Sequence, residues 1–412
     1  MSRLSELIRE LCPDGVEYKK LGEVATVYRG GNFQKKDFVE QGVPCIHYGQ
    51  IYTRYNLFTD KTLTFISKEK AEKQKIAVKN DIIMAVTSEN IEDVCKCVAW
   101  LGDENVAVSG HSAIIHHSLD AKYLTYFFHS KQFFSQKRKL AHGTKVIEVT
   151  PDSLNSVILP VPPLEVQREI VRVLDKFTFY TAELTAELTA RKKQYECYRD
   201  KLLNFEEWGG TSDVVWRTLG DVCSVVAGGT PSKKNDSYWV GGNIKWLGST
   251  VCKNQKTVDE VTGYITEKGF AESSAKIMKA GTTLIALVGA TIGKVAFLPF
   301  EASINQNIAG IYPKDTNTLN PSYLYYACTA LYPKFLALTH GSKLTMANME
   351  FVRSLKVAVP SIEIQNRIVN VLDRFDALCN DLTSGLPAEI ALRQKQYEYY
   401  RDKLLDFKRL DA

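Results

Sequence analysis

The chain contains an internal repeat, and this repeat limits the possible folds more than any other feature. Residues 161–177 (VPPLEVQREIVRVLDKF) match residues 359–375 (VPSIEIQNRIVNVLDRF) at ten of 17 positions. Residues 191–205 (RKKQYECYRDKLLNF) differ from residues 393–407 (RQKQYEYYRDKLLDF) at only three of 15 positions. The first pair of blocks is separated by 198 residues and the second by 202, so the second copy carries four extra residues. The chain therefore consists of two related halves.

Shorter matches recur at the same separation of 198 residues, and the sequence between them diverges. They are Leu21–Val24 with Leu219–Val222, Gly30–Gly31 with Gly228–Gly229, and His142–Lys145 with His340–Lys343. Each half thus has a variable globular part followed by a nearly invariant helical part. Two such halves in one chain can mimic a symmetric dimer.

The variable parts, about residues 15–158 and 214–356, have the pattern of a mixed α/β fold. Short β-branched and aromatic runs are separated by Gly, Asn and Ser turns, which predicts strands. We expect a helix before each of the repeated segments His142–Lys145 and His340–Lys343, called the His-Gly loops below. Asn320 is the expected N-cap of the second helix. The predicted strands are 24–28, 82–86, 94–99, 283–288 and 308–312, and the predicted helices are 121–140 and 321–338.

The invariant parts have the heptad-like spacing of coiled-coil helices. A helix over 164–204 would be about 60 Å long at about 1.5 Å per residue, which exceeds a small domain. It needs a partner, and the other copy, running antiparallel, is the expected one. Gly385 and Pro387 lie in the four-residue insertion and are expected to break or bend the second helix.

Composition excludes several classes of protein. Of the 412 residues 45% are hydrophobic and 24% are charged, which is unlike a disordered, collagen-like or membrane-spanning chain. The net charge of +5 allows local basic surfaces but does not by itself indicate a nucleic-acid partner. Nine scattered cysteines without a C-x-x-C pair favour reduced thiols in a cytosolic protein. The N-terminal residues lack the apolar core of a signal peptide, and we expect no transmembrane helix.

Three strings with enzyme-like letters have simpler structural interpretations. Pro13-Asp14 followed by Glu17 and Lys19 has the letters of a metal-dependent nuclease, but these residues also suit a surface turn. Residues 289–294 (GATIGK) resemble a phosphate-binding loop that is one residue short, with Val295 where Ser or Thr would bind magnesium, so we interpret them as an ordinary loop. The histidines at 111, 116 and 117 lack metal-ligand spacing. We therefore expect the chain to catalyse no reaction itself and to bind no metal.

The repeated His-Gly loops are candidates for contacts with DNA phosphates, because a hydroxyl, a lysine and backbone amides come together in each. The alternative is a turn that terminates a helix, with Gly143 and Gly341 as C-caps. The residues are His142, Gly143, Thr144 and Lys145 in the first half, and His340, Gly341, Ser342 and Lys343 in the second.

The repeated Gly-Gly runs, each followed by polar residues and two lysines, suit an approach to the phosphate backbone with amides free for base edges. A plain hairpin loop is the alternative. Polar residues farther along each half are candidates for base contacts. The run residues are Gly31, Asn32, Lys35, Gly229, Thr230, Pro231 and Lys233, and the base-contact candidates are Gln50, Arg54, Lys245, Asn305, Gln306 and Asn307.

Two variable parts alternating with two nearly identical helical regions resemble the specificity (S) subunit of type I restriction-modification enzymes. The resemblance covers essentially the whole chain, and the P-x-x-E-x-Q-x-x-I pattern at the head of each helix carries it. The run Thr181–Leu188 (TAELTAEL) is similar to the short repeat of the IC subfamily, although residues 380–391 of the second copy depart from it.

The resemblance implies an α/β (α+β) architecture of two target recognition domains and two long antiparallel helices with a pseudo-twofold repeat. The recognition domains would be residues 1–158 and 209–356, and the helical spacers 159–208 and 357–412. The spacers would set the gap in a bipartite DNA site and dock the methyltransferase subunits. The spacer and docking residues would be Pro162, Glu165, Gln167, Ile170 and Leu174, with Pro360, Glu363, Gln365, Ile368 and Leu372.

The implied partners are double-stranded DNA, two modification (methyltransferase) subunits and, through them, restriction subunits. S-adenosylmethionine, ATP and magnesium would belong to those subunits, with no cofactor in this chain, which would act in the cytoplasm without a membrane. Two alternatives stay open from the residues alone. One is a self-sufficient nuclease using Pro13-Asp14, Glu17 and Lys19, and the other is a coiled-coil scaffold that binds no DNA.

Overall fold

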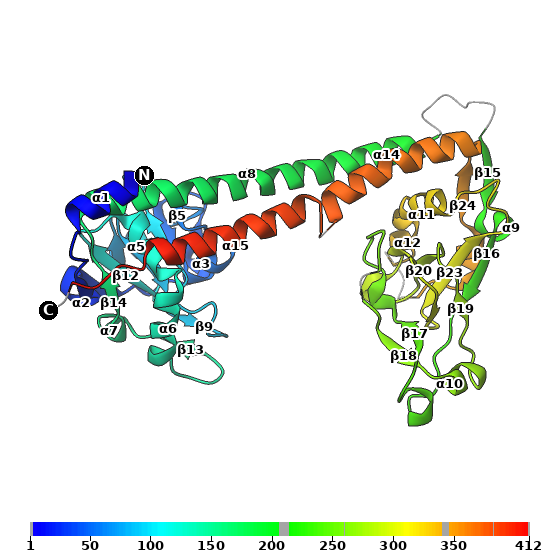
Figure 1. Cartoon of the computed structure of the whole chain (residues 1–412), viewed down its shortest axis with the longest axis horizontal. Helices are drawn as coiled ribbons and strands as arrows, with labels where there is room; N and C mark the ends of the chain where they lie inside the picture. The colour runs from blue at the N-terminus through cyan, green and yellow to red at the C-terminus, as the bar shows by residue number, and fades with distance from the viewer. Residues whose placement is uncertain (1–2, 206–213, 259, 340–345, 382, 411–412) are drawn as a thin grey trace. The chain divides into compact units, whose positions relative to one another are not determined.

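The computed structural model of the chain describes residues 3–205, 214–258, 260–339, 346–381 and 383–410. It forms two compact units (Figure 1). Unit 1 comprises residues 1–183 and 391–412, and unit 2 comprises residues 184–390. The boundaries fall inside two helices, α8 (Leu164–Leu203) and α15 (Leu386–Leu404), so each unit holds one globular part and segments of both conserved regions. The four-part division proposed from the sequence stays a prediction.

The globular part of unit 1 contains two five-stranded sheets. The first has the order β2-β12-β8-β10-β5 and the second the order β3-β6-β4-β11-β7. Two small antiparallel pairs, β1-β14 and β13-β9, complete it. The strands are β1 (Tyr18–Lys20), β2 (Ala25–Arg29), β3 (Phe38–Val39), β4 (Val43–Ile46), β5 (Phe58–Thr59), β6 (Thr64–Ile66), β7 (Lys75–Ala77), β8 (Ile82–Ala85), β9 (Thr87–Ser88), β10 (Cys97–Trp100), β11 (Val106–Val108), β12 (Ser112–His117), β13 (Ile147–Glu148) and β14 (Ile158–Pro160).

Unit 2 repeats this topology with two four-stranded sheets, β16-β23-β20-β21 and β18-β17-β22-β19, and the pair β15-β24. Even the parallel pair β4-β11 has a parallel counterpart in β17-β22. The repeat therefore extends through the divergent regions. The predicted strands are present, although the one expected at 94–99 begins only at Cys97 because residues 94 and 95 form a turn. The strands are β15 (Val215–Thr218), β16 (Cys223–Ala227), β17 (Ile244–Leu247), β18 (Gly263–Ile265), β19 (Ile277–Met278), β20 (Thr283–Ala286), β21 (Val295–Phe297), β22 (Ala302–Ile304), β23 (Ile308–Pro313) and β24 (Lys356–Val359).

The central strand of the first sheet in each unit is buried on both faces. In β8, Ile82 and Met84 pack in the cluster that contains the helices, whereas Ile83 and Ala85 pack in a second cluster with strands of the other sheet. In β20 the same alternation places Ile285 and Leu284 in different clusters. Continuous apolar runs suit such strands because side chains alternate between the two faces.

The single helix expected before each His-Gly loop is wrong, because both are divided in two. In unit 1 the break comes at His129–Ser130, where the Ser130 hydroxyl accepts a hydrogen bond from the Phe133 amide at 3.2 Å and starts a new helix. The predicted N-cap Asn320 is confirmed by its bonds to the amides of Ser322 and Tyr323. The helices are α5 (Ala121–Phe128) and α6 (Lys131–Leu140), and α11 (Pro321–Thr329) and α12 (Tyr332–Thr339).

The conserved regions form the predicted long helices. Helix α8 is continuous over 40 residues. The second region is broken between α14 (Ile362–Asn380) and α15, as its glycine and proline predicted. The Asp381 carboxylate accepts hydrogen bonds from the Thr383 and Ser384 amides. A Cβ at Gly385 would lie 2.5 Å from the Ala377 carbonyl oxygen, so the break requires glycine there.

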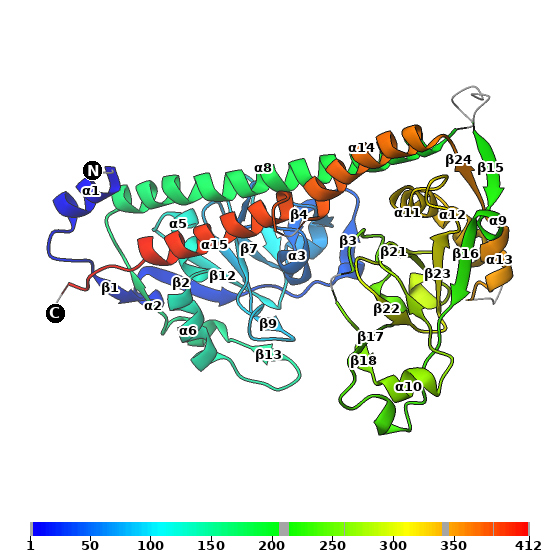
Figure 2. The same cartoon turned by 45° about the vertical axis from the view of Figure 1, so that its right-hand side comes forward.

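Equivalent aromatic contacts hold the helices together in each unit. In unit 1, Phe177 of α8 stacks on Tyr400 of α15 at 5.2 Å between centroids. In unit 2, Phe375 of α14 stacks on Tyr198 of α8 at 5.5 Å. Phe177 and Phe375 are equivalent positions of the repeat, and so are Tyr400 and Tyr198, so the same contact is made in both units. Figure 2 shows α15 antiparallel to the first half of α8 within unit 1. The antiparallel pairing predicted from the sequence therefore holds within each unit.

None of the described helices, long or short, has an apolar stretch that could cross a membrane. The remaining elements are short. The α-helices are α1 (Arg3–Leu11), α2 (Leu21–Val24), α3 (Tyr48–Thr53), α4 (Lys68–Ala71), α7 (Pro151–Leu154), α9 (Leu219–Val222), α10 (Glu267–Ala271) and α13 (Met349–Ser354), and the 3₁₀ helices are η1 (Lys35–Asp37), η2 (Asp236–Tyr238), η3 (Ser249–Val251) and η4 (Gly289–Thr291).

Candidate nucleic-acid interface

The two Gly-Gly pairs lie where the chain leaves the first sheet and approaches the second. The Gly31 amide donates to the Val108 carbonyl at 2.7 Å, and the Gly229 amide donates to the Ile304 carbonyl at 2.9 Å. A Cβ at Gly228 would lie 2.0 Å from the Ile304 carbonyl oxygen. Glycine is therefore required for close backbone packing, and the prediction that these amides are free for DNA is wrong.

In unit 1 the structure brings together three segments that the sequence singled out separately, namely the Gly-Gly run, the segment of Gln50 and the His-Gly loop. They meet around the turn Ser109–His111, which joins β11 to β12 and was not predicted as a site. The Ser109 hydroxyl accepts from the Tyr48 amide at 2.9 Å, and the rings of Tyr48 and His111 lie 4.9 Å apart. Lys35 lies beside the start of helix α3, because a Cβ built on Gly49 would be 3.9 Å from the Cε of Lys35.

The His-Gly loop of unit 1 reaches this turn through Arg29. The Arg29 guanidinium forms an ion pair with Glu148 in β13 and donates to the Gly110 carbonyl at 3.3 Å. Strand β13 pairs with β9, whose Thr87 hydroxyl lies 3.2 Å from His111 Nδ1. The loop thus lies next to the turn although some 30 residues of sequence separate them.

The loop itself does not terminate the preceding helix, so the C-cap interpretation of Gly143 is wrong. Helix α6 ends at Leu140 with Ala141 as its cap, and Gly143 follows two residues later with φ of +102°. The glycine instead allows a tight turn closed by paired bonds between His142 and Glu148. His142, Thr144 and Lys145 are exposed. His340, Gly341, Ser342 and Lys343 lie outside the described residues.

The other predicted residues of unit 1 differ in how accessible they are. Asn32, Lys35 and Arg54 are exposed. Gln50 is committed to the fold, because its side-chain oxygen accepts from the His47 amide at 3.0 Å and from the Thr64 hydroxyl at 3.2 Å. Burial lowers the pKa of His47 to about 4, with Lys35 and His111 adding to the effect. The neutral imidazole accepts from the Gly49 amide and caps α3.

In unit 2 the Gly-Gly run and the segment of Lys245 converge on the turn Asn305–Asn307. The Thr230 hydroxyl donates to Gln306, and Trp246, next to Lys245, donates its indole N–H to the Gly229 carbonyl at 3.1 Å. Lys245 Nζ lies 3.9 Å from the centre of the Phe300 ring. Asn305 is 9% exposed and accepts from the Asn307 amide, Pro231 is buried, and Lys233 and Gln306 are exposed.

Both invariant glutamines are buried and attach a long helix to its own globular part. The Gln167 side chain accepts from the Asp120 amide at 2.9 Å and donates to the Pro162 carbonyl at 2.8 Å. Gln365 repeats both bonds, with the Asn320 amide and the Pro360 carbonyl. The glutamine therefore connects the helix start to the N-cap of α5 or α11.

An Asp–Tyr–Lys contact strengthens each attachment. Asp175 accepts from Tyr126 and from Lys122, both at 2.7 Å. Asp373 accepts from Tyr326 at 2.5 Å and pairs with Lys256. The lysine comes from α5 in unit 1 and from the loop before β18 in unit 2, so the contact is kept although its cation differs in origin.

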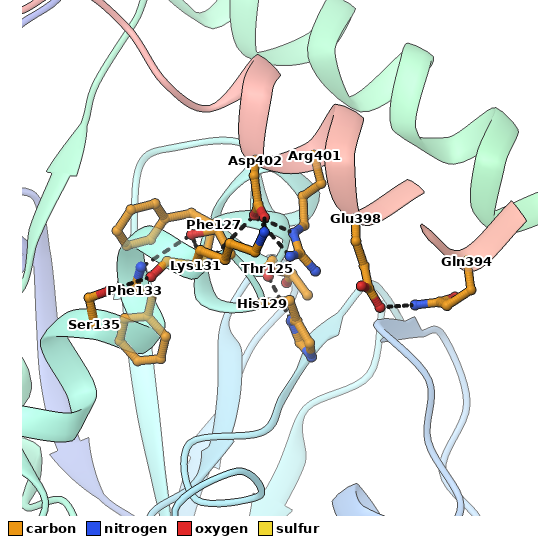
Figure 3. Close-up of polar contacts among 11 residues, drawn as sticks. Thr125, Phe127, His129, Lys131, Phe133, Ser135, Gln394, Glu398, Arg401 and Asp402 are labelled. Carbon is orange, nitrogen blue, oxygen red and sulfur yellow. Dashed lines mark hydrogen bonds and ion pairs between the residues drawn. The ribbon is translucent and has the colours of Figure 1, made fainter. Parts of the chain in front are cut away.

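Helix α15 makes a further contact with the turn between α5 and α6, as Figure 3 shows. The Lys131 amide donates to the Asp402 carboxylate at 3.1 Å, and the same carboxylate accepts from Arg401. Asp402 thus binds the amide of the first residue of α6, where a negative charge is favoured. Nearby, partly exposed His129 bonds the Thr125 carbonyl oxygen through Nδ1, and desolvation of its ring lowers its pKa to about 4.

Most of the predicted docking residues face inward and cannot touch a partner directly. Glu165 and Glu363 are the two that are exposed. Any part that the others play in docking can only be indirect, through the position of the helix. The buried ones are Pro162, Gln167, Ile170, Leu174, Pro360, Gln365, Ile368 and Leu372.

The enzyme-like strings do not assemble into a site. Glu17 forms an ion pair with Lys19 at 2.7 Å on β1, and Asp14 lies exposed in a bend. Gly289–Lys294 connects β20 to β21 as an antiparallel hairpin, so the loop interpretation is confirmed. Within the described residues no three His, Cys, Asp or Glu side chains are grouped so that they could hold a metal ion.

The turn Ser109–His111 is the part of the interface that sequence reasoning missed. Its structural counterpart in unit 2 is the turn Asn305–Asn307. The two turns are 196 residues apart in the sequence, whereas the repeated motifs are 198 residues apart. No letter is shared between the two turns, so a comparison of residues could not align them. The backbone hydrogen bonds align them.

A comparison with known families decides the identity of the repeated architecture. The family described as the type I restriction modification DNA specificity domain matches twice, at residues 13–192 and 211–392. The chain belongs to this specificity-domain family. The two matches begin 198 residues apart, which is the separation of the internal repeat.

Curated relatives of this family are similar over part of their length. The chain is 42% identical to the EcoR124I/EcoR124II type I restriction enzyme specificity subunit of Escherichia coli over 60% of this chain, and it spans 61% of that relative. It is 33% identical to a putative type I restriction enzyme specificity subunit of Haemophilus influenzae, covering 64% of this chain and 68% of that one.

Solved structures support the fold assignment of the specificity-domain family. The S subunit of a type I restriction-modification system from M. genitalium has a TM-score of 0.55 at 15% identity, over 95% of this chain and 96% of that one. A chain from a study of complex assembly and conformational transition in a type I system has a TM-score of 0.61 at 17% identity, over 95% and 98%. The expected α/β architecture with two sheet domains and a long helix is confirmed.

Proposed function

We propose that this chain determines which DNA sequence a type I restriction-modification complex acts on, and that it catalyses no reaction itself. One observation carries the proposal. In each unit the divergent polar segments converge on one turn, whereas the contacts that attach the helices to the sheets are repeated almost unchanged. Variation in the DNA-facing residues on a constant framework is what a specificity protein needs.

Each globular part would bind one half of a bipartite DNA site, with the recognition domains at residues 1–158 and 209–356. Lysines and arginines at the interface, such as Lys35, Lys145 and Lys233, would neutralise phosphates, which predicts affinity that falls with salt. The helical spacers, residues 159–208 and 357–412, would set the gap between half-sites.

The partners would be two modification subunits and, through them, restriction subunits. Exposed faces of the helices, including Glu165 and Glu363, would dock the modification subunits. S-adenosylmethionine, ATP and magnesium would bind to those partners and not to this chain. The complex would act on DNA in the cytoplasm. The similarity of Thr181–Leu188 to the IC subfamily repeat remains a prediction.

The test is a map of methylated adenines in cells that express this chain with the modification subunit of its own system. We expect one motif made of two short sequences separated by a fixed gap. Without this chain, the same cells should show no methylation at that motif.

Methylation that shares no sequence, or that persists unchanged without this chain, would contradict the proposal. DNA cleavage by the purified chain with magnesium alone would support the nuclease alternative instead. A complex with modification subunits that binds no DNA would support the scaffold alternative.

A further inference from the structure

We propose that the turns Ser109–His111 and Asn305–Asn307 are one repeated base-recognition element, and that His111 and Asn307 each contact a base in their own half-site. The proposal rests on the proposed function, which it extends to single residues. In each unit the turn carries the chain from the second sheet to the first, between β11 and β12 or between β22 and β23.

Backbone hydrogen bonds establish that the turns are equivalent. In each unit the carbonyl of the last turn residue accepts a hydrogen bond from the first amide after the central strand. In unit 1 the Val86 amide donates to the His111 carbonyl at 2.9 Å, and in unit 2 the Leu287 amide donates to the Asn307 carbonyl at 2.8 Å. Three further bonds also recur in pairs. In unit 1 the amides of Gly31, Ser109 and Ser112 donate to the carbonyls of Val108, Ile46 and Ser109, respectively. In unit 2 the amides of Gly229, Asn305 and Ile308 donate in the same way to the carbonyls of Ile304, Leu247 and Asn305.

The backbone of each turn is therefore fixed, and only its side chains differ between units. The same holds for the neighbouring segment, where the Val149 amide donates to the Val86 carbonyl as the Ala347 amide donates to the Leu287 carbonyl. A fixed backbone with variable side chains presents different chemistry at one place, which direct base recognition requires.

The side chain of His111 is exposed and held in a defined orientation. Its Nδ1 lies 3.2 Å from the Thr87 hydroxyl, and its ring packs against Tyr48 with centroids 4.9 Å apart. Among the described residues no hydrogen bond is made to the other ring nitrogen, Nε2. A side chain held on one edge and open on the other loses little conformational freedom when it binds a base.

Asn307 is partly exposed, and its backbone is held by Asn305 and Leu287 while its amide side chain makes no hydrogen bond to the described residues. Its neighbour Gln306 is exposed and is oriented by Thr230. A free amide can pair with adenine through two hydrogen bonds, whereas the open nitrogen of an imidazole makes one. The two half-sites are thus recognised by different groups at the same structural position.

Cations flank the turn and would hold the phosphate backbone close to it. Exposed Lys35 lies at the start of the adjacent helix α3, and Arg29, which also pairs with Glu148, bonds the Gly110 carbonyl. The His-Gly loop with exposed Lys145 lies beside the same turn, next to β9. Contacts to phosphates position the protein, so the turn between these cations is placed to meet base edges.

Reciprocal substitutions test the proposal. We would express the H111N and N307H variants separately with the modification subunits and determine each methylation motif. We expect H111N to change the preference at one base of one half-site and N307H to change one base of the other, each by roughly five- to a hundred-fold. The matched control is H116N, the same substitution at the far end of β12, which should leave both half-sites unchanged.

Unchanged half-sites in both H111N and N307H, with a normal wild-type motif, would overturn the inference while leaving the proposed function intact. A uniform loss of methylation at an unchanged motif would also overturn it, because that result describes a phosphate contact. If one variant fails to assemble, the other decides alone. If the wild-type complex itself has no motif, the proposed function fails first.

Discussion

At the scale of single residues, the glycine pairs show how a repeated motif can be structural where a binding role was expected. Their amides are bonded to the neighbouring strands, and Gly31 and Gly229 each have backbone or side-chain atoms within 2.5 Å of where a Cβ would lie. The pairs are kept because two sheets pass each other there. The exposed polar residues, such as Asn32, Lys35 and Lys233, lie beside the glycines.

We expect G228A to lower the free energy of unfolding of unit 2 by about 2 kcal/mol or more, because the added Cβ would clash with a backbone carbonyl that cannot swing away. Urea unfolding followed by circular dichroism measures the change. G263A is the matched control, since nothing lies within 4 Å of a Cβ at Gly263. Equal effects of the two substitutions would contradict this account.

At the scale of elements, the conserved helices are attached to the sheets by buried polar groups. Gln365 makes three hydrogen bonds, to the Asn320 amide and to the Thr318 and Pro360 carbonyls. In the Q365L variant these backbone groups stay buried without partners, so we expect a loss of about 2–4 kcal/mol in stability. Thermal unfolding of the full chain measures it.

The matched control for Q365L is E363Q, two residues earlier on the same helix but exposed. Its melting temperature should stay close to that of the wild type. If Q365L is as stable as E363Q, the glutamine is not what holds the helix to the sheet domain.

The break between α14 and α15 makes a prediction about acid. Hydrogen bonds from Ser384 and Thr383 hold the pKa of the Asp381 carboxyl well below its usual range. Its stabilising effect is therefore present above the unfolded-state pKa and is lost as the pH falls towards the folded-state pKa. We expect D381N to be less stable than wild type at about pH 6, and the difference to shrink towards about pH 3. D406N, which changes an exposed carboxylate outside this break, is the matched control.

At the scale of the whole molecule, the two units differ in their response to pH. Unit 1 contains His47, His117 and His129, and burial lowers the pKa of each to about 4. The unfolded chain binds more protons between about pH 6.5 and pH 4, so stability falls as the pH is lowered through this window. Unit 2 contains one histidine, at position 340.

We therefore expect acidification from about pH 7 to about pH 5 to destabilise unit 1 before unit 2. Hydrogen exchange measured by mass spectrometry, corrected for the intrinsic rate, should show lost protection in β12 and α5 but not in β23 and α11. H129Q should weaken this effect, and H142Q, at an exposed position, is the matched control. Simultaneous loss in both units would contradict the assignment.

The length of α8 makes a prediction about the DNA site. Deleting Thr185–Leu188 removes one four-residue unit, or about 6 Å of helix at about 1.5 Å per residue. Under the proposed function, the gap in the methylation motif should shorten while both half-sites stay the same. A T185A/E187A variant keeps the length and should keep the gap. An unchanged gap in the deletion variant would reject the role of the helix as a spacer.

The elements that the sequence predicted well are those set by local patterns. The heptad spacing predicted α8, the glycine and proline predicted the break before α15, and β-branched runs predicted β8 and β20. The division of residues 121–140 at Ser130 was missed, because a single hydroxyl that caps a new helix does not disturb the apolar pattern around it.

The candidate interface was predicted in pieces. Lys35, Lys145 and Lys233 are exposed beside the converging segments, but Gln50 is occupied as a cap and the Gly31 amide is bonded. Whether a polar group is free depends on neighbours that are distant in the chain. Composition and spacing cannot reveal this for a single side chain.

The sequence by itself determined that the molecule is built twice, because identical helical blocks at a constant separation require two copies of one structure. It also determined the family, since those blocks carry the family pattern. Only the tertiary structure decided that His111 and Asn307 are equivalent and that Gln167 and Gln365 face inward. The physical reason is that side-chain identity can diverge while backbone hydrogen bonds, which depend little on the side chain, keep the fold unchanged.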